Sequence, residues 1–107
     1  MNNYDKISLF EQLNRNNILE LELFYEVLEQ CDALKTNYQE YMTTAPINCD
    51  EELLRLSSAD YDLCCALITM LLREDHFSEG SFVRRLHLGQ VEPIIKRIIA
   101  TEGQTVD

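Results

Sequence analysis

The chain has 107 residues, a formal net charge of −10 at pH 7 and 46% apolar residues, with only three glycines and two prolines. This length suits one domain with a single hydrophobic core, which we expect to cover residues 1–107. So few turn-forming residues argue against a β-sandwich or barrel and favour helices. The negative charge would repel nucleic-acid phosphates and anionic lipid, so we expect no direct nucleic-acid binding and no membrane association.

The sequence also predicts where in the cell the protein resides and whether it binds a cofactor. Its N-terminal residues lack the basic and apolar regions of a secretory signal, and the longest apolar run covers only residues 63–72. A membrane-spanning helix needs about 20 apolar residues, so we expect a cytoplasmic protein. The cysteines form neither a C-x-x-C pair nor a repeated spacing, which predicts reduced thiols that pack as small apolar side chains and no metal or cofactor. They are Cys31, Cys49, Cys64 and Cys65.

Two helices are expected in the N-terminal half. The first covers about residues 5–14, and the asparagines that follow it favour a break. Apolar residues then recur at spacings of three and four from Ile18 to about Leu34, which predicts a long helix. Tyr38 and Tyr41 continue this spacing, and the residues before Pro46 are expected to end the helix.

Acidic side chains form a ridge between the two apolar strips of this second helix. The ridge comprises Glu22, Glu26 and Glu29, with Asp32 and Glu40 as outlying members. Residues 1–62 carry 13 acids and 4 bases, a net charge of −9, so we expect the ridge to bind a protein partner with a basic surface. Such a face more often only keeps a protein soluble. One apolar strip suits contact with a second copy in a homodimer, through Leu19, Leu23 and Val27.

The middle of the chain is expected to form a short helix and then the core helix. Asp50 is the predicted cap of the short helix, which runs to about Leu56. Residues 57–60 supply hydroxyls and an acid for a second helix start, and the segment Tyr61–Arg73 is apolar on nearly every side. We therefore expect an all-α bundle of five or six helices with Tyr61–Arg73 at its centre.

Two further helices complete the predicted bundle. Ser78 is expected to cap a helix over residues 79–88, and Gly89 stands where a left-handed residue ends a helix. The last helix covers about residues 90–100, with Pro93 in its first turn, where a missing N–H costs little. Residues 101–107 are expected to be a frayed tail.

A distinctive run follows the core helix. Residues 73–80, called the elbow below, read Arg-Glu-Asp-His-Phe-Ser-Glu-Gly, and Gly89 and Arg97-Ile98 follow at a distance. With these features the segment Leu63–Ile99 resembles an uncharacterised bacterial family, the domain-of-unknown-function family 6508. The sequence departs from the family at His76, where Arg is usual, and at Ser78, where Cys is frequent. The resemblance implies a helical fold and no particular activity.

Two hypotheses account for the polar residues of the elbow. In the first, His76 activates Ser78 as a nucleophile and a carboxylate orients the histidine, as a hydrolase-like enzyme requires. In the second, which we favour, polar elbow residues cap the two adjoining helices and Phe77 anchors the turn in the core. No glycine-rich nucleophile turn accompanies Ser78, and His76 and His87 are too far apart for a zinc-binding pair on one helix. We therefore expect no catalytic residue and no metal ligand.

Three functions remain open from the sequence. The leading one is a small, non-catalytic protein-interaction or regulatory module that acts through its acidic N-terminal helical face. The second is an inhibitor that imitates nucleic acid and blocks a host nuclease or DNA-binding protein, as anti-restriction and anti-CRISPR proteins do. The third is a hydrolase-like enzyme centred on the elbow.

Overall fold

The computed structural model describes residues 3–15 and 21–102, and within these ranges all regular structure is helical. The predicted all-α fold is confirmed. Six α-helices and two short 3-10 helices follow one another in the described chain. They are α1 (Asn3–Arg15), α2 (Leu21–Gln30), η1 (Tyr38–Tyr41), α3 (Cys49–Leu53), η2 (Leu56–Ser58), α4 (Tyr61–Phe77), α5 (Ser81–His87) and α6 (Glu92–Glu102).

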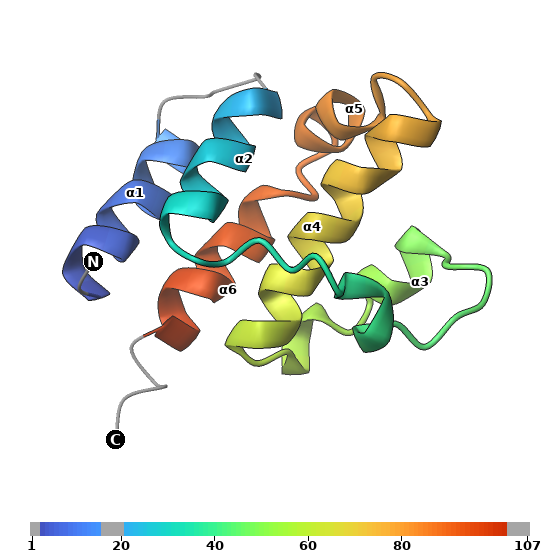
Figure 1. Ribbon diagram of the computed structural model, residues 1–107, viewed down its shortest axis with the longest axis horizontal. Helices are drawn as coiled ribbons and strands as arrows, with labels where there is room; N and C mark the ends of the chain where they lie inside the picture. Colours follow the sequence, from blue (N-terminus) through green and yellow to red (C-terminus); the bar gives the residue numbers. More distant parts are fainter. Residues whose placement is uncertain (1–2, 16–20, 103–107) are drawn as a thin grey trace.

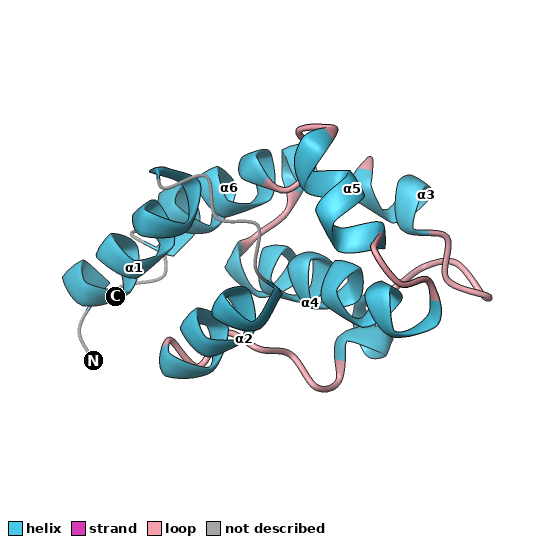
Figure 2. Cartoon of the chain, turned by 90° about the horizontal axis from the view of Figure 1, so that it is seen from above, coloured by secondary structure: helices cyan, strands magenta, loops and turns pink. Residues whose placement is uncertain are grey.

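The helices form two layers around one core. Figure 2 shows α1, α6, α5 and α3 in one layer and α2 and α4 in the other. In Figure 1, α4 crosses the middle of the molecule, where it contacts α6, α5, α3 and η1, while α1 packs along α6. None of the helices in the described ranges has the length and apolar character that crossing a membrane requires.

The predicted central position of the helix from Tyr61 is confirmed. Nine consecutive residues of α4, from Cys64 to Leu72, are buried, and they meet buried side chains of α1, α2, α5 and α6. The carboxylate of Asp60 caps the helix by accepting a hydrogen bond from the Leu63 N–H at 2.9 Å. The predicted acid therefore caps the core helix, whereas Ser57 and Ser58 form part of η2 and their hydroxyls are not its cap.

The second helix ends earlier than its apolar spacing predicts. Its start at Ile18 lies outside the described residues, and α2 ends at Gln30 instead of running to Leu34 or beyond. Asp32 adopts a left-handed conformation with φ of 56°, and the Ala33 N–H donates to the Leu28 carbonyl at 2.7 Å. These are the marks of a Schellman C-cap with aspartate in the usual glycine position, so the chain turns back across α4 and Tyr38–Tyr41 forms the separate helix η1.

Two predicted helix caps are wrong. Asn48 caps α3, because its side-chain oxygen accepts from the Glu51 N–H at 3.0 Å, and Asp50 lies inside the helix. Gly80, with φ of 89°, precedes α5, and Ser78 does not cap it. Asp75 takes that role from the preceding helix, since its Oδ1 accepts hydrogen bonds from the backbone N–H groups of Gly80 and Phe82.

The ends of the last two helices differ less from expectation. Gly89 is left-handed with φ of 74° after α5, as predicted, and Pro93 lies in the first turn of α6. This helix continues to Glu102, however, and both Thr101 and Glu102 are buried. The Thr101 hydroxyl donates to the Arg97 carbonyl at 2.7 Å. The predicted tail is therefore wrong for its first two residues, and 103–107 lie outside the described residues.

Candidate functional site

The acidic ridge lies on the solvent side of α2. Glu22, Glu26 and Glu29 are exposed, whereas other residues of the same helix point into the core. Asp32 is exposed in the turn after the helix, and Glu40 is exposed on η1. The ridge is therefore one helix face of three carboxylates, and its two outlying members belong to other elements.

The apolar strip predicted to meet a second copy is largely used inside the molecule. Val27 is only 6% exposed and belongs to the core, and Leu23 is partly buried against that core. Leu19 lies outside the described residues. The prediction is wrong for Val27 because α2 buries more than one of its faces within its own chain.

Acidic side chains outnumber basic ones by a larger factor at the surface than in the whole sequence. Of the described lysine and arginine side chains, only Arg84 and Lys96 are exposed. Others form ion pairs with acids of the same chain, such as Lys35 with Asp62 at 3.1 Å. By contrast, thirteen acidic side chains of the described chain are exposed. They are Asp5, Glu11, Glu22, Glu26, Glu29, Asp32, Glu40, Asp50, Glu51, Asp60, Asp62, Glu79 and Glu92.

An open groove of about 640 Å³ lies where η1, the following loop and α3 meet the C-terminal end of α4. Three elbow residues, Glu74, Phe77 and Ser78, contribute to one wall, so the elbow does adjoin a cavity. The full lining is Tyr38, Gln39, Pro46, Ile47, Asn48, Cys49, Asp50, Met70, Glu74, Phe77, Ser78 and Arg85.

Arg85 organises the charged side of this groove. Its guanidinium is buried and donates to both oxygens of Glu74, to Asp50 Oδ1 at 2.9 Å and to Gln90 Oε1 at 2.7 Å. Hydrogen bonds from Arg85 hold the pKa of Glu74 below its usual value, and Glu74 in turn raises the pKa of Arg85. Sequence reasoning missed this cluster, since no local pattern joins residues 11 and 35 positions apart.

A buried carboxylate holds the loop that forms the opposite wall. Glu52 is fully buried and accepts hydrogen bonds from the backbone N–H groups of Thr43 and Thr44 at 2.9 and 2.8 Å, and from Arg55 at 2.8 Å. Burial alone would raise the pKa of Glu52, but the hydrogen bonds from Thr44, Arg55 and Thr43 outweigh it and lower the pKa to about 2. Arg55 also donates to the Tyr41 carbonyl, so η1 and α3 are joined through this pair.

The elbow does not bring Ser78 and His76, the nucleophile and base of the hydrolase hypothesis, into one pocket. Ser78 lines the groove, whereas His76 is exposed and is not among the lining residues. The thiol of Cys49 also lines the groove, and burial together with Glu74 raises its pKa to about 11, which disfavours the reactive thiolate at neutral pH. Within the described ranges no three histidine, cysteine or acidic side chains are grouped as a metal site requires.

The elbow phenylalanine lies in solvent and not in the core. Phe77 is 89% exposed at the end of α4, because this helix continues one turn past Arg73 and carries the side chain outward. Phe82 of α5 fills the core position instead, with its ring 4.9 Å from that of Phe24 in an edge-to-face arrangement. The expected anchoring role of Phe77 is therefore wrong, and its exposure beside the groove needs another explanation.

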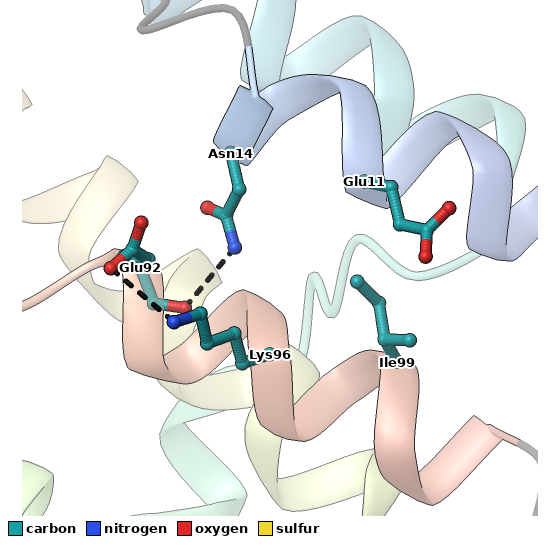
Figure 3. A pocket seen from close by; sticks show the side chains of 5 residues that line it. All are labelled: Glu11, Asn14, Glu92, Lys96 and Ile99. Carbon is teal, nitrogen blue, oxygen red and sulfur yellow. Dashed lines mark hydrogen bonds and ion pairs between the residues drawn. The ribbon is translucent and has the colours of Figure 1, made fainter.

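A second, shallower cavity of about 470 Å³ lies between α1 and α6. Figure 3 shows Asn14 donating to the backbone oxygen of Glu92, and the Lys96 ammonium beside the Glu92 carboxylate. Glu11 and Ile99 face the same space from opposite helices (Figure 3). The bond from Asn14 joins the two helices, the Lys96–Glu92 pair lies within α6, and the cavity brings together no set of buried polar groups.

Comparison with known proteins places the chain in a family. A family model described as a family of unknown function, DUF6508, matches residues 15–104. No curated protein and no solved structure matches the chain. The match extends well beyond the C-terminal segment 63–99 on which the resemblance was based and covers most of the chain, so it takes in α2, the ridge and both walls of the groove. The chain belongs to the DUF6508 family.

Proposed function

We propose that this chain is a non-catalytic protein-interaction module whose partner presents a basic surface. The observation that carries the proposal is the imbalance of exposed charge, thirteen acidic side chains against Arg84 and Lys96 among the described residues. A surface of this sign attracts a basic protein over a Debye length and raises its rate of association. Two copies of the chain both carry an acidic surface, so charge repulsion disfavours a homodimer.

The acidic ridge supports the proposal as a contact surface. Glu22, Glu26 and Glu29 stand on one face of a regular helix that contains no lysine or arginine. Buried neighbours such as Phe24 and Leu28 fix this helix to the core, so the three carboxylates are held on a rigid element. Charged groups on a rigid element lose little conformational freedom when a partner binds.

The same excess of exposed carboxylates supports a narrower candidate, an inhibitor that imitates nucleic acid. Carboxylates along a helix can occupy the positively charged groove with which a nuclease or DNA-binding protein contacts phosphates. Such a partner would be displaced by DNA, whereas a basic partner of another class would not.

We place this function in the cytoplasm. All four cysteines are free thiols in the structure, and three of them are buried. Proteins of oxidising compartments commonly pair their cysteines, while cytosolic proteins keep them reduced.

The test is capture of partners from a lysate of the source cell at low and moderate salt, followed by mass spectrometry. The wild type is compared with a ridge variant, Glu22→Gln with Glu26→Gln and Glu29→Gln. A control with the same charge change elsewhere carries Asp5→Asn, Glu11→Gln and Glu92→Gln. We expect the wild type and this control to capture a basic protein that is released by salt and is not captured by the ridge variant.

Two results would change the account. Failure to enrich any basic protein with the wild type would contradict the proposed function. Equal capture by the wild type and the ridge variant would leave the function standing and move its contact surface away from α2. Addition of duplex DNA separates the two candidates, because only the partner of a nucleic-acid mimic should be released.

A further inference from the structure

The groove between α3 and α4 combines an apolar wall with an exposed aromatic side chain. Met70 forms part of its buried floor, and Ile47 lines the side next to α3. Phe77 extends this apolar surface outward, since 89% of it is exposed. A single exposed apolar residue is ordinary, but one that continues the wall of a cavity enlarges a contiguous apolar surface.

The charge available to a ligand in this groove is negative. Arg85 makes four hydrogen bonds to Glu74, Asp50 and Gln90, out of the five N–H donors of a guanidinium. Its positive charge is therefore committed to acids of the same chain, and it offers little to a phosphate or carboxylate. The side chain of Asp50 remains 78% exposed, so one carboxylate faces solvent at the groove.

Acidic residues that adjoin the lining residues in the sequence add to this negative charge. Glu40, Glu51 and Glu79 are exposed, and each directly follows a lining residue in the sequence. The surroundings of the groove thus favour a cation and disfavour an anion. An apolar surface with acidic surroundings is complementary to a peptide that carries both apolar and basic side chains.

We infer that this groove binds a segment of a partner protein in which a lysine or arginine stands close to an aliphatic or aromatic side chain. The cationic group pairs with Asp50, and the apolar side chain packs against Phe77, Ile47 and Met70. A volume of about 640 Å³ is within the range of ligand sites and holds a few side chains. The inference rests on the proposed function, because it assigns a place to the basic partner.

A second copy of the chain suits this groove less well. Arg84 and Leu88 are exposed four positions apart and offer the required chemistry. Each copy carries a net charge of −10, however, so approach of two copies is opposed by repulsion between their acidic surfaces. The favoured occupant is therefore a different, basic protein.

The test uses the full chain and three fluorescein-labelled octapeptides. Lysine and leucine alternate in the probe, glutamate and leucine in the first control, and lysine and serine in the second. Binding is measured by fluorescence anisotropy, and the site is mapped by amide chemical shifts of the ¹⁵N-labelled protein. We expect the probe to bind more tightly than both controls and to shift the amide signals of Ile47, Asp50 and Phe77.

Variants at two exposed apolar residues make the test specific. Phe77→Ser should weaken binding of the probe at least ~10-fold, as expected for the aromatic anchor of a peptide. Leu54→Ser should leave binding unchanged, since Leu54 is 80% exposed and does not line the groove. Both residues lie outside the core, so both variants should fold. Asp50→Asn is compared in the same way with Glu11→Gln, since Glu11 is an exposed acid that belongs to neither the groove nor the ridge.

Three outcomes of the peptide experiments would overturn the inference. They are equal binding of the probe and its two controls, equal effects of the Phe77 and Leu54 variants, and shifts confined to α2. Self-association that depends on Phe77, seen by light scattering, would also overturn it and would make a second copy the occupant. Capture of a basic partner through the ridge alone would overturn the groove as its site while the proposed function stands. Absence of any basic partner would contradict the proposed function itself.

Discussion

The guanidinium of Arg85 binds both carboxylate oxygens of Glu74, with Nε–Oε1 at 2.7 Å and Nη2–Oε2 at 2.9 Å. The pair joins α5 to α4, and the third nitrogen of Arg85 joins them to Asp50 of α3. One side chain thus connects three helices at the floor of the groove. Because Arg85 is only 3% exposed, its charge depends on these acids for compensation.

Removal of this cation should be strongly destabilising. Arg85→Met should lower the free energy of unfolding by about 3 kcal/mol, because Glu74 is left partly buried without its partner. Arg85→Lys should lose less, since it keeps the charge but cannot bind both oxygens. Arg84→Met is the matched control at an exposed position and should change stability by less than about 0.5 kcal/mol. Urea unfolding at pH 7 measures all three, and equal effects at the two positions would contradict the role given to Arg85.

Stability should depend on pH through Glu52. Its pKa in the folded protein is about 2, below the ordinary value of 4.5, so the ionised group stabilises the fold above pH 4.5. This contribution, about 3 kcal/mol, should decline as the pH falls from 4.5 towards 2. Glu52→Gln should be less stable than the wild type at pH 7 and should approach it at low pH. A stability difference between the two that stays constant across this range would contradict the assignment.

Two phenylalanines should respond oppositely to truncation. Phe82→Ala should cost about 3–5 kcal/mol, because Phe82 is fully buried against Phe24 and leaves a cavity. Phe77→Ala should change stability by less than about 0.5 kcal/mol, since its ring is in solvent. Thermal and urea unfolding of both variants measures the contrast. A large loss for Phe77→Ala would mean that its side chain packs in the core after all.

The four thiols should react slowly in the folded protein. Cys31, Cys64 and Cys65 are fully buried, and burial raises the pKa of Cys65 to about 12 and that of Cys64 to about 11. Cys49 is half-buried, with its pKa also about 11. Because the thiolate is the reacting form, a colorimetric disulfide reagent at pH 8 should modify none of them rapidly. Addition of guanidinium chloride should release all four, and rapid modification of the folded protein would contradict this burial.

The core helix could be predicted from sequence because many positions agree on it. From Cys64 to Leu72 almost every side chain is apolar, and Asp60 precedes the helix with a capping carboxylate. The end of α2 could not be predicted, because Asp32 occupies the left-handed position at which glycine usually marks the end of a helix. Leu34 also continues the apolar spacing. The exposure of Phe77 likewise depended on how far α4 extends, which apolar character alone does not set.

Only part of the candidate site could be predicted from the sequence. The ridge could be predicted as a solvent-facing row because its glutamates follow helical spacing between apolar residues. Its role as a contact surface stays a prediction. The groove could not be predicted, since Asp50, Glu74 and Arg85 meet only after three helices pack together. The elbow was singled out by its sequence, but its contribution is to the wall of that groove.

Thr69 influences how α4 is rotated about its own axis within the core. A helix that is apolar around its circumference can turn about its axis without exposing any polar group, so packing alone gives it several similar settings. Thr69 is fully buried, and its hydroxyl donates to the Cys65 carbonyl and accepts from the Lys35 N–H at 3.1 Å. Rotation of α4 about its axis would move that acceptor away from Lys35 and leave a partly buried N–H unpaired. The one hydroxyl in this apolar run thus fixes the orientation of the central helix at its middle, as Glu74 and Asp75 do near its C-terminal end.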